Sequence, residues 1–143
     1  MAEPTPEEVA AAIGERIAGS FPGDLGIEPL KAARGEARGR LVVDGRHLHP
    51  GGYVHGGVWV GFADSVAAWG TMMNLLPGHD FTTVELKLNV FAAATKGDEL
   101  IAIAEPLHVG RSTQVWEVRV SKGERLVASF SCTQMILAPN APA

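Results

Sequence analysis

The sequence has little of several features that would point to particular classes of protein. It holds a single cysteine, Cys132, which excludes an internal disulfide framework and is typical of a reducing compartment. No apolar run approaches the roughly 20 residues of a membrane-spanning helix. The acidic N-terminus, MAEPTPEEVA, lacks the basic and apolar parts of a signal peptide. We therefore expect a cytoplasmic protein with no membrane partner.

Positive charge and nucleotide-binding motifs are also scarce. The formal net charge is −4 and no basic stripe is present, so nucleic acid is not an expected partner. The glycine-rich fingerprint of dinucleotide-binding proteins and the P-loop are both missing. What remains is a chain of 143 residues, 46% hydrophobic and 20% charged, which fits one globular domain over residues 1–143.

Apolar periodicity predicts two helices and five strands. Thr5 is suited to cap the first helix, and the second is apolar around most of its circumference, which is typical of a buried helix. Four of the strands follow one another through short turns, as antiparallel hairpins do. The expected elements are helices within 1–19 and 57–76, strands 36–43, 83–91, 100–109, 113–120 and 125–137, and a loose tail at 139–143.

This order predicts an α+β fold in which an antiparallel sheet wraps around one long buried helix, with a further helix at the N-terminus. In 83–91, apolar and polar residues alternate, which predicts a half-buried strand. Cys132 shares the apolar face of the last strand, so we expect it in the core. The large residues of the long helix are also expected in the core rather than in a pocket, namely Trp59, Phe62 and Trp69.

The segment HGGVWVGFAD places two glycines where the long helix begins. The first turn of a helix has unpaired N–H groups at the positive end of the dipole. Because Gly56 and Gly57 have no Cβ, a carbonyl oxygen can approach those amides closely. A tight turn that simply needs glycine explains the same residues equally well.

Asp64 is unusual because it lies inside this apolar helix. A buried carboxylate must be paired or have a raised pKa, and such groups concentrate at catalytic sites, although purely structural hydrogen bonds are the alternative. At 1.5 Å per residue, Gly56 and Asp64 stand ~12 Å apart. Reacting atoms must approach to roughly 3–3.5 Å. If both residues are catalytic, the site therefore spans two chains.

Other candidates carry weaker signals. The histidines at 47, 49 and 55 have no carboxylate or cysteine at a zinc-binding spacing, so no metal is expected. Gly110 and Arg111 lie between two strands and are explained by a turn, although a guanidinium can also hold a phosphate.

Taken together, GYVHGG, HGGVWVGFAD and the strand TTVELKLNVF resemble the hotdog-fold acyl-CoA thioesterases over roughly residues 20–138. The closest similarity is to the phenylacetate-degradation (PaaI-type) and 4-hydroxybenzoyl-CoA thioesterase branch. The resemblance implies hydrolysis of an aromatic or medium-chain acyl-CoA to a free acid and CoA, with no cofactor beyond the CoA of the substrate. It also implies a homo-oligomer, in which a dimer forms the active site and pairs again into a homotetramer.

The resemblance also implies roles by position. Gly56 would donate the backbone N–H that polarises the thioester carbonyl, and Asp64 of the opposing protomer would be the nucleophile or the general base. Thr82 or Thr83 would supply a hydroxyl that orients water or substrate. His49 stands where many relatives carry Asn or Gln. The remaining residues expected to contact the substrate are His55, Gly57, Lys87 and Arg111, the last two near the CoA phosphates, with Arg46 as a weaker candidate.

Alternatives stay open within the same fold. An enoyl-CoA hydratase or dehydratase would pair His49 with Asp64, fifteen residues further on, although the proline-rich loop typical of those enzymes is missing. A non-catalytic acyl-CoA-binding protein is equally compatible with the fold, because fold does not imply function. Within the thioesterases, Ala68 lacks the hydroxyl that some 4-hydroxybenzoyl members place one turn beyond the acid, which favours the phenylacetate type.

Overall fold

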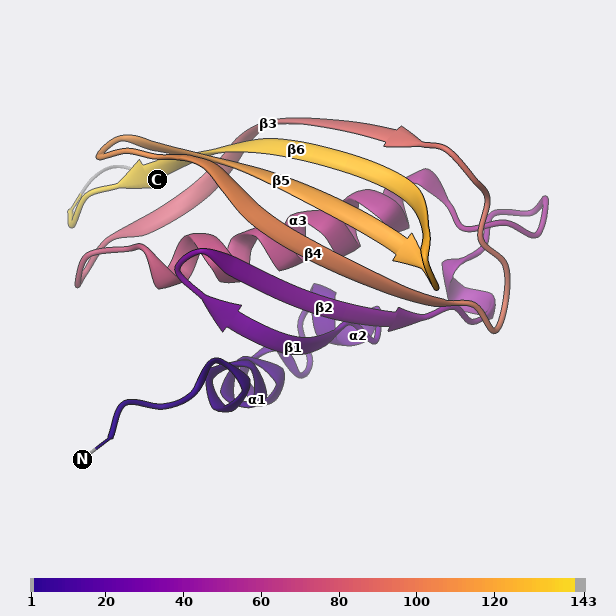
Figure 1. The fold of residues 1–143 in the computed structure, drawn as a ribbon, viewed down its shortest axis with the longest axis horizontal. Coiled ribbons are helices and arrows are strands. Elements are labelled where there is room, and N and C mark those ends of the chain that lie inside the picture. The colour runs from indigo at the N-terminus through magenta and orange to yellow at the C-terminus, as the bar shows by residue number, and fades with distance from the viewer. Residues whose placement is uncertain (1, 141–143) are drawn as a thin grey trace.

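A curved six-stranded antiparallel sheet packs against one long helix, α3 (Gly56–Met73), in a computed structural model that describes residues 2–140 (Figure 1). The strand order across the sheet is β1-β2-β4-β5-β6-β3. This is the hotdog architecture that the resemblance implies. The other elements are α1 (Pro6–Ile17), α2 (Phe21–Asp24), β1 (Glu28–Ala33), β2 (Glu36–Val42), a 3₁₀ turn (Gly45–His47), β3 (Asp80–Val90), β4 (Glu99–Val109), β5 (Thr113–Lys122) and β6 (Arg125–Leu137).

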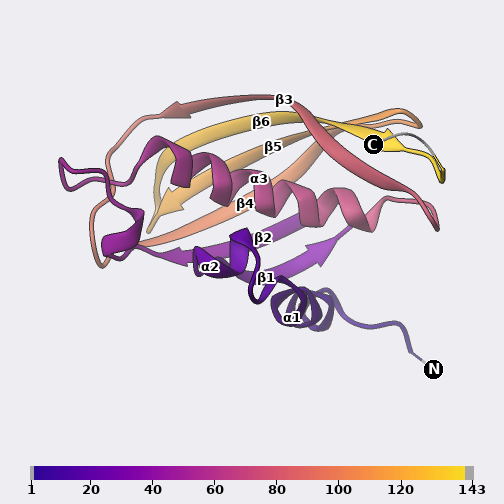
Figure 2. The ribbon, with the colours of Figure 1, turned by 180° about the vertical axis from the view of Figure 1, so that it is seen from behind.

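The helix α3 lies on the concave face of the sheet, as the view from behind shows (Figure 2). Small residues allow this close approach. A Cβ built on Gly70 of α3 would lie 2.4 Å from the Trp116 ring of β5, and one built on Gly39 of β2 would lie 2.6 Å from Val66 of α3. At both glycines, the space that a Cβ would occupy is therefore taken by a neighbouring side chain. The predicted core is confirmed, since the buried residues include Trp59, Phe62, Trp69 and Cys132.

The N-terminal helix begins where the sequence predicts. Thr5 is the N-cap, and its hydroxyl accepts a hydrogen bond from the Glu8 N–H while the Glu8 carboxylate accepts one from the Thr5 N–H. This reciprocal pairing satisfies two N–H groups that the helix itself leaves free. Ile13 is buried, and α1 lies beside β1 at one edge of the sheet (Figure 1).

Three elements were not predicted: the short helix α2, the 3₁₀ turn and the strand β1. The register between β1 and β2 shifts between Pro29 and Lys31, so the inside–outside alternation that would reveal a strand is interrupted. The long helix also ends earlier than predicted, at Met73. There the Asn74 side chain donates to the Arg34 carbonyl at 2.8 Å and to the Gly70 carbonyl at 3.3 Å.

The strand β3 is at the edge of the sheet and is more exposed than predicted. Val84, Leu86 and Val90 are 51%, 41% and 43% exposed. Leu86 and Val90 pair across to Cys132 and Ala128, which are buried, so these two apolar residues lie on the helix side of the sheet. The predicted half-buried face therefore exists, but α3 of the same chain does not cover it.

The tail predicted as loose, 139–143, is only partly described. Pro139 and Asn140 lie in a turn, and residues 141–143 lie outside the described residues. Within residues 2–140, no helix has both the length and the apolar character needed to cross a membrane.

The contact between Gly70 and Trp116 predicts a measurable asymmetry between two helical glycines. Gly70→Ala should lower the free energy of unfolding by about 1–3 kcal/mol, because the new methyl group overlaps the Trp116 ring. Gly14→Ala in α1 is the matched control. Its Cβ meets nothing closer than 3.7 Å, so this change should stabilise the protein by about 0.5–1 kcal/mol. Urea unfolding measures both, and equal effects would contradict the packing argument.

Candidate active site

The first turn of α3 is capped by His55. The backbone of His55 is extended (φ −64°, ψ 141°), and its Nδ1 accepts a hydrogen bond from the Gly57 N–H at 2.8 Å. The His55 carbonyl accepts from the N–H groups of Val58 and Trp59. Among the described residues, this leaves the Gly56 N–H as the unpaired amide at the positive end of the helix dipole. Such an amide is suited to bind a carbonyl oxygen or an oxyanion.

Nothing within residues 2–140 requires glycine at position 56. Gly56 is exposed and does not have a positive φ, and a Cβ built on it would meet no atom within 4 Å. At Gly57, by contrast, a Cβ would lie 3.1 Å from His55 Nδ1. Turn geometry therefore does not account for Gly56. The open space beside its Cα leaves room for a ligand.

The loop before α3 is held in place by His47, which is fully buried. Its Nδ1 accepts from the Asp44 N–H at 2.9 Å, its Nε2 lies 2.6 Å from the Leu25 carbonyl oxygen, and its own carbonyl accepts from the His55 N–H at 2.9 Å. Because Nδ1 accepts, Nε2 carries the proton and donates to Leu25. His47 thus has a structural role, because its hydrogen bonds join the end of α2 to the start of α3.

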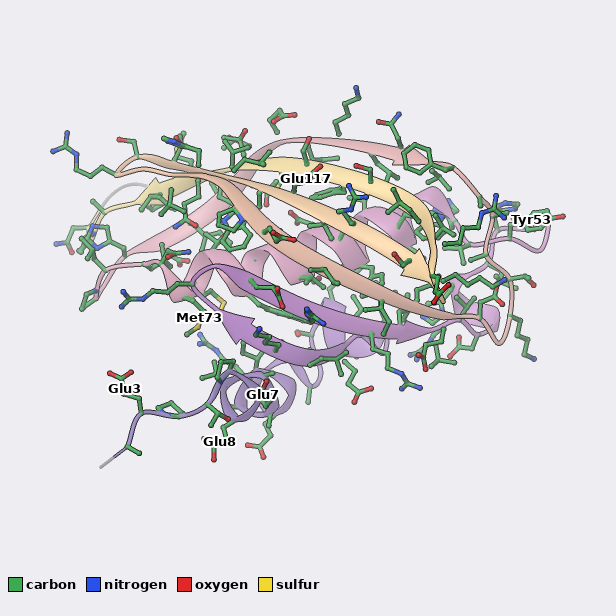
Figure 3. All side chains as sticks on the ribbon, in the orientation of Figure 1. Glu3, Glu7, Glu8, Tyr53, Met73 and Glu117 are labelled. Carbon is green, nitrogen blue, oxygen red and sulfur yellow. The ribbon has the colours of Figure 1, made fainter. Side chains whose placement is uncertain are left out.

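His49 lies in the tight turn that follows, whose tip carries Tyr53 at the end of the molecule (Figure 3). The Nδ1 of His49 accepts from the Gly51 N–H at 2.9 Å. A Cβ on Gly51 would lie 2.6 Å from the His49 ring, so glycine is needed for this ring position. In the neutral ring the proton is then on Nε2. His49 is therefore arranged to donate a hydrogen bond through Nε2.

Asp64 lies half-buried in the middle of α3 and faces the edge strand β3. Thr83 Oγ1 donates to Asp64 Oδ1 at 2.9 Å. Burial raises the pKa of the Asp64 carboxyl above its usual range, and the hydrogen bond from Thr83 offsets part of that rise. The alternative positions predicted for the hydroxyl are thus distinguished by geometry: Thr83 contacts Asp64, and Thr82 is exposed.

Gln134 is a member of this group that was not among the sequence candidates. It is fully buried on β6, and its side-chain amide lies 2.9 Å from Thr83 Oγ1. A signal was present in the sequence, because Gln134 continues the inward face of strand 125–137 beyond Phe130 and Cys132. A glutamine at an inward position is costly to bury without partners.

The predicted phosphate-binding residues lie on different elements of the fold. Arg111 lies in the turn between β4 and β5 and lines a cavity of about 560 Å³ near the C-terminal end of α3. Lys87 is exposed on β3. Arg46 pairs with the Asp44 carboxylate and donates to the Asp24 carbonyl, so it has a structural explanation. The chain brings Asp64 and Thr83 together, and the helix keeps Gly56 about 12 Å from Asp64.

The sequence matches curated relatives whose names specify thioester hydrolysis. It is 34% identical over 110 residues to the 1,4-dihydroxy-2-naphthoyl-CoA hydrolase of Listeria monocytogenes, covering 76% of this chain and 89% of the relative. It is 25% identical to the proofreading thioesterase EntH of Cronobacter turicensis over 127 residues, covering 87% of this chain and 92% of the relative.

Solved structures match the fold closely. A thioesterase from Haemophilus influenzae superposes with a TM-score of 0.84 at 22% identity, covering 96% of this chain and 93% of that one. A single-site mutant of the phenylacetic acid degradation protein PaaI from Thermus thermophilus superposes with a TM-score of 0.75 at 28% identity, covering 80% and 96%. The family model described as "Thioesterase superfamily" matches residues 51–129, the segment that holds the end of the loop, α3, the strands β3 to β5 and the start of β6. The chain therefore belongs to the thioesterase superfamily and is a thioester hydrolase with the hotdog fold.

Proposed function

We propose that this protein hydrolyses acyl-CoA thioesters to a free acid and CoA at a site shared between two copies of the chain. The observation that carries the proposal is the pairing of the half-buried Asp64 carboxylate with Thr83 at the open edge of the sheet. An acid held in this way is suited to act on water or on a carbonyl carbon. In this superfamily the bond to be broken is the thioester C–S bond.

Gly56 supplies the complementary group. As the thioester carbonyl is attacked, negative charge develops on its oxygen, and a fixed N–H at a helix start stabilises that charge. The Gly56 amide is unpaired among the described residues, and the space where a Gly56 Cβ would lie is open. Asp64 then either takes a proton from the water that attacks the carbonyl carbon, which gives the free acid directly, or attacks that carbon itself to form a mixed anhydride that water hydrolyses. In both cases the C–S bond breaks, and the CoA thiolate leaves and is protonated.

His49 is proposed to donate to the substrate carbonyl or the water through Nε2–H. Its Nδ1 lone pair is already used by the Gly51 N–H. A dehydratase mechanism needs a histidine nitrogen with a free lone pair to remove a proton from carbon, and a hydratase passes through the same step in reverse. The arrangement of His49 therefore favours thioester hydrolysis over that alternative.

The exposed apolar residues of β3 support a dimer. An edge strand with unpaired backbone groups and apolar side chains on the helix side favours pairing with another chain. A second copy added at β3 with two-fold symmetry would extend the sheet and bring the start of its α3 toward Asp64 of the first copy. This arrangement removes the separation of about 12 Å that a single helix imposes.

An aromatic acyl group is the proposed substrate class. The relative from Listeria monocytogenes is named for an aromatic acyl-CoA substrate, and PaaI is named for phenylacetic acid degradation. Rates of thiol release from phenylacetyl-, hydroxyphenylacetyl-, 4-hydroxybenzoyl-, benzoyl- and 1,4-dihydroxy-2-naphthoyl-CoA, beside short and long aliphatic acyl-CoAs, identify the substrate used in the experiments below.

Gly56→Pro tests the amide while leaving the helix start intact. Proline is favoured at the first helical position, and the extended backbone of His55 is the conformation that a residue before proline adopts. Losing this one donor should lower kcat by about 10²–10³-fold. Gly56→Ala keeps the N–H and is the control. Equal rates for the two variants would contradict the role of the Gly56 amide.

Asp64→Asn tests the acid and should lower the hydrolysis rate by about 10²–10⁴-fold. The active form is the carboxylate, so wild-type kcat should fall as the pH drops through the pKa of Asp64. Because burial raises that pKa, the acid limb should lie above the pH of about 3.9 expected for an ordinary aspartate.

The control for Asp64→Asn is thermal unfolding at pH 7. A carboxyl whose pKa is higher in the folded state destabilises the folded protein as the pH rises through that range. The neutral amide should therefore be no less stable than the wild type. Unchanged turnover in a folded Asp64→Asn variant would contradict the role of Asp64, whereas ligand binding without any turnover in the wild type would favour the binding-protein alternative.

Mixing the two inactive variants tests whether the site is shared between chains. In a mixed dimer of Gly56→Pro and Asp64→Asn chains, one of the two sites receives an intact Gly56 from one chain and an intact Asp64 from the other. After unfolding and refolding together, the mixture should recover about a quarter of wild-type activity. Each variant refolded alone is the control. No recovery in a mixture shown to contain mixed dimers would place both residues of a site in one chain.

A further inference from the structure

A row of polar side chains crosses the helix-facing side of the sheet beside Asp64. Thr83 of β3 is the register partner of Gln134 of β6, which is in turn the partner of Gln114 of β5. Gln134 is 0% exposed and Gln114 is 1% exposed. Two buried glutamines in an otherwise apolar core require hydrogen-bond partners, since an unpartnered amide is costly to bury.

The two glutamines have different partners. Gln114 accepts from the Trp116 indole N–H at 2.9 Å, and its amide nitrogen lies 3.4 Å from the Thr71 carbonyl oxygen. Gln134 instead has Oε1 placed 2.9 Å from Thr83 Oγ1 and Nε2 placed 3.6 Å from Cys132 Sγ. Gln114 thus belongs to the packing of α3 on β5, whereas Gln134 is one hydrogen bond away from the Asp64 pair.

The hydrogens around Thr83 determine which way the Gln134 amide points. The Thr83 hydroxyl has one hydrogen, and it lies 2.9 Å from Asp64 Oδ1 as well as 2.9 Å from Gln134. The carboxylate is the stronger acceptor and takes that hydrogen. The contact with Gln134 is then favourable only when an amide N–H donates to Thr83 Oγ1. A half-turn of the amide exchanges its two ends, which are assigned from such networks; we therefore assign Nε2 to the Thr83 side and Oε1 to the Cys132 side, the reverse of the placement above.

The other end of the amide is satisfied by the same orientation. The Gln134 oxygen then faces Cys132, whose S–H is a weak donor. Burial, and after it the negative charge of Asp64, raise the pKa of the Cys132 thiol to about 12, so the thiol keeps its hydrogen at neutral pH. In this orientation the Cys132 S–H, one Gln134 N–H and the Thr83 O–H each point along the series toward the Asp64 carboxylate.

We propose that Gln134 is a positioning residue, whose amide donates to Thr83 and thereby holds the Thr83 hydrogen on Asp64 Oδ1. This inference rests on the proposed function of Asp64. With Oδ1 held by Thr83, the second oxygen, Oδ2, is left to act on water or on the acyl carbon. Gln134 itself touches neither the substrate nor the reacting atoms.

Few titratable groups within residues 2–140 lie around Asp64, so a change in its pKa can be assigned to the loss of the Gln134 amide. Among the described residues of the sheet, Cys132 is the titratable group whose pKa responds to the charge of Asp64. Glu85 of β3 accepts from the Thr133 hydroxyl at 3.0 Å, on the opposite face of the sheet, although its charge also reaches Cys132. The shift in the pKa of Asp64 arises from burial and from Thr83.

The decisive measurement is the pKa of Asp64, read by ¹³C NMR of protein labelled at the aspartate side-chain carboxyl, with Asp64→Asn to assign the signal. In Gln134→Met, loss of the donor behind Thr83 should raise that pKa by about half a unit, since linked hydrogen bonds strengthen one another only modestly. In a Thr83→Val background, Gln134→Met should add nothing. An unchanged pKa, or a lower one from an amide oxygen that had competed for the Thr83 hydrogen, would overturn the proposal.

Gln114→Met is the matched control, because it removes the same buried side chain from the neighbouring strand. It should leave the pKa of Asp64 and the acid limb of kcat unchanged, while the acid limb in Gln134→Met moves upward with the pKa. If no acyl-CoA is hydrolysed, the proposed function fails while the NMR titration still decides the role of Gln134.

A measurement on the wild type covers the case in which Gln134→Met does not fold. The ¹⁵N–¹H signals of the Gln134 side-chain amide should titrate together with the Asp64 carboxyl, because the two are joined through Thr83. The signals of Gln114 serve as the internal reference and should stay constant over the same pH range. A Gln134 signal as insensitive as that of Gln114 would overturn the proposal.

Discussion

The packing of α3 into the concave face of the sheet is the contact on which the rest of the structure depends. The helix and the sheet approach closely because Gly39 and Gly70 have no side chains. Val66 occupies the space where a Gly39 side chain would lie, and the Trp116 ring occupies that of Gly70. A helix held this tightly has a fixed rotation and a fixed start. The unpaired amide of Gly56 and the carboxylate of Asp64 are therefore presented in constant directions, Gly56 at the free end of the helix and Asp64 toward the edge strand β3.

A rigid helix also explains why one chain is not enough for the proposed chemistry. The amide and the acid are separated by eight residues, or about 12 Å, and no bending of α3 would bring them to one carbon atom. The uncovered apolar residues of β3 lie on the same side of the sheet as α3. Asp64, which the Gly56 amide of its own chain cannot reach, thus lies beside the apolar surface of β3 that favours binding of a second copy.

The acid is maintained at a cost to stability, which is common where a site needs a group in an unfavourable environment. Burial disfavours the charged form of Asp64, and the hydrogen bond from the Thr83 hydroxyl restores part of the stability that the charged form loses. Behind Thr83, Gln134 and Cys132 replace what would otherwise be apolar core. In the proposed arrangement these buried polar groups set the direction of one hydrogen, and the packing of the core alone would not require them.

The sequence by itself determined the local features, because these depend on neighbours in the chain. The Thr5 cap, the long apolar helix with Gly56 at its start and Asp64 inside it, and the hairpins of 100–137 were all readable from residue types and spacing. Strand β1 was hidden by the bulge after Pro29. Only the tertiary structure decided that Thr83 rather than Thr82 meets Asp64, that β3 is an exposed edge, and that Gln134 stands behind Thr83. Each of these follows from register between strands distant in sequence, and a shift of one residue in register turns a side chain to the opposite face of the sheet.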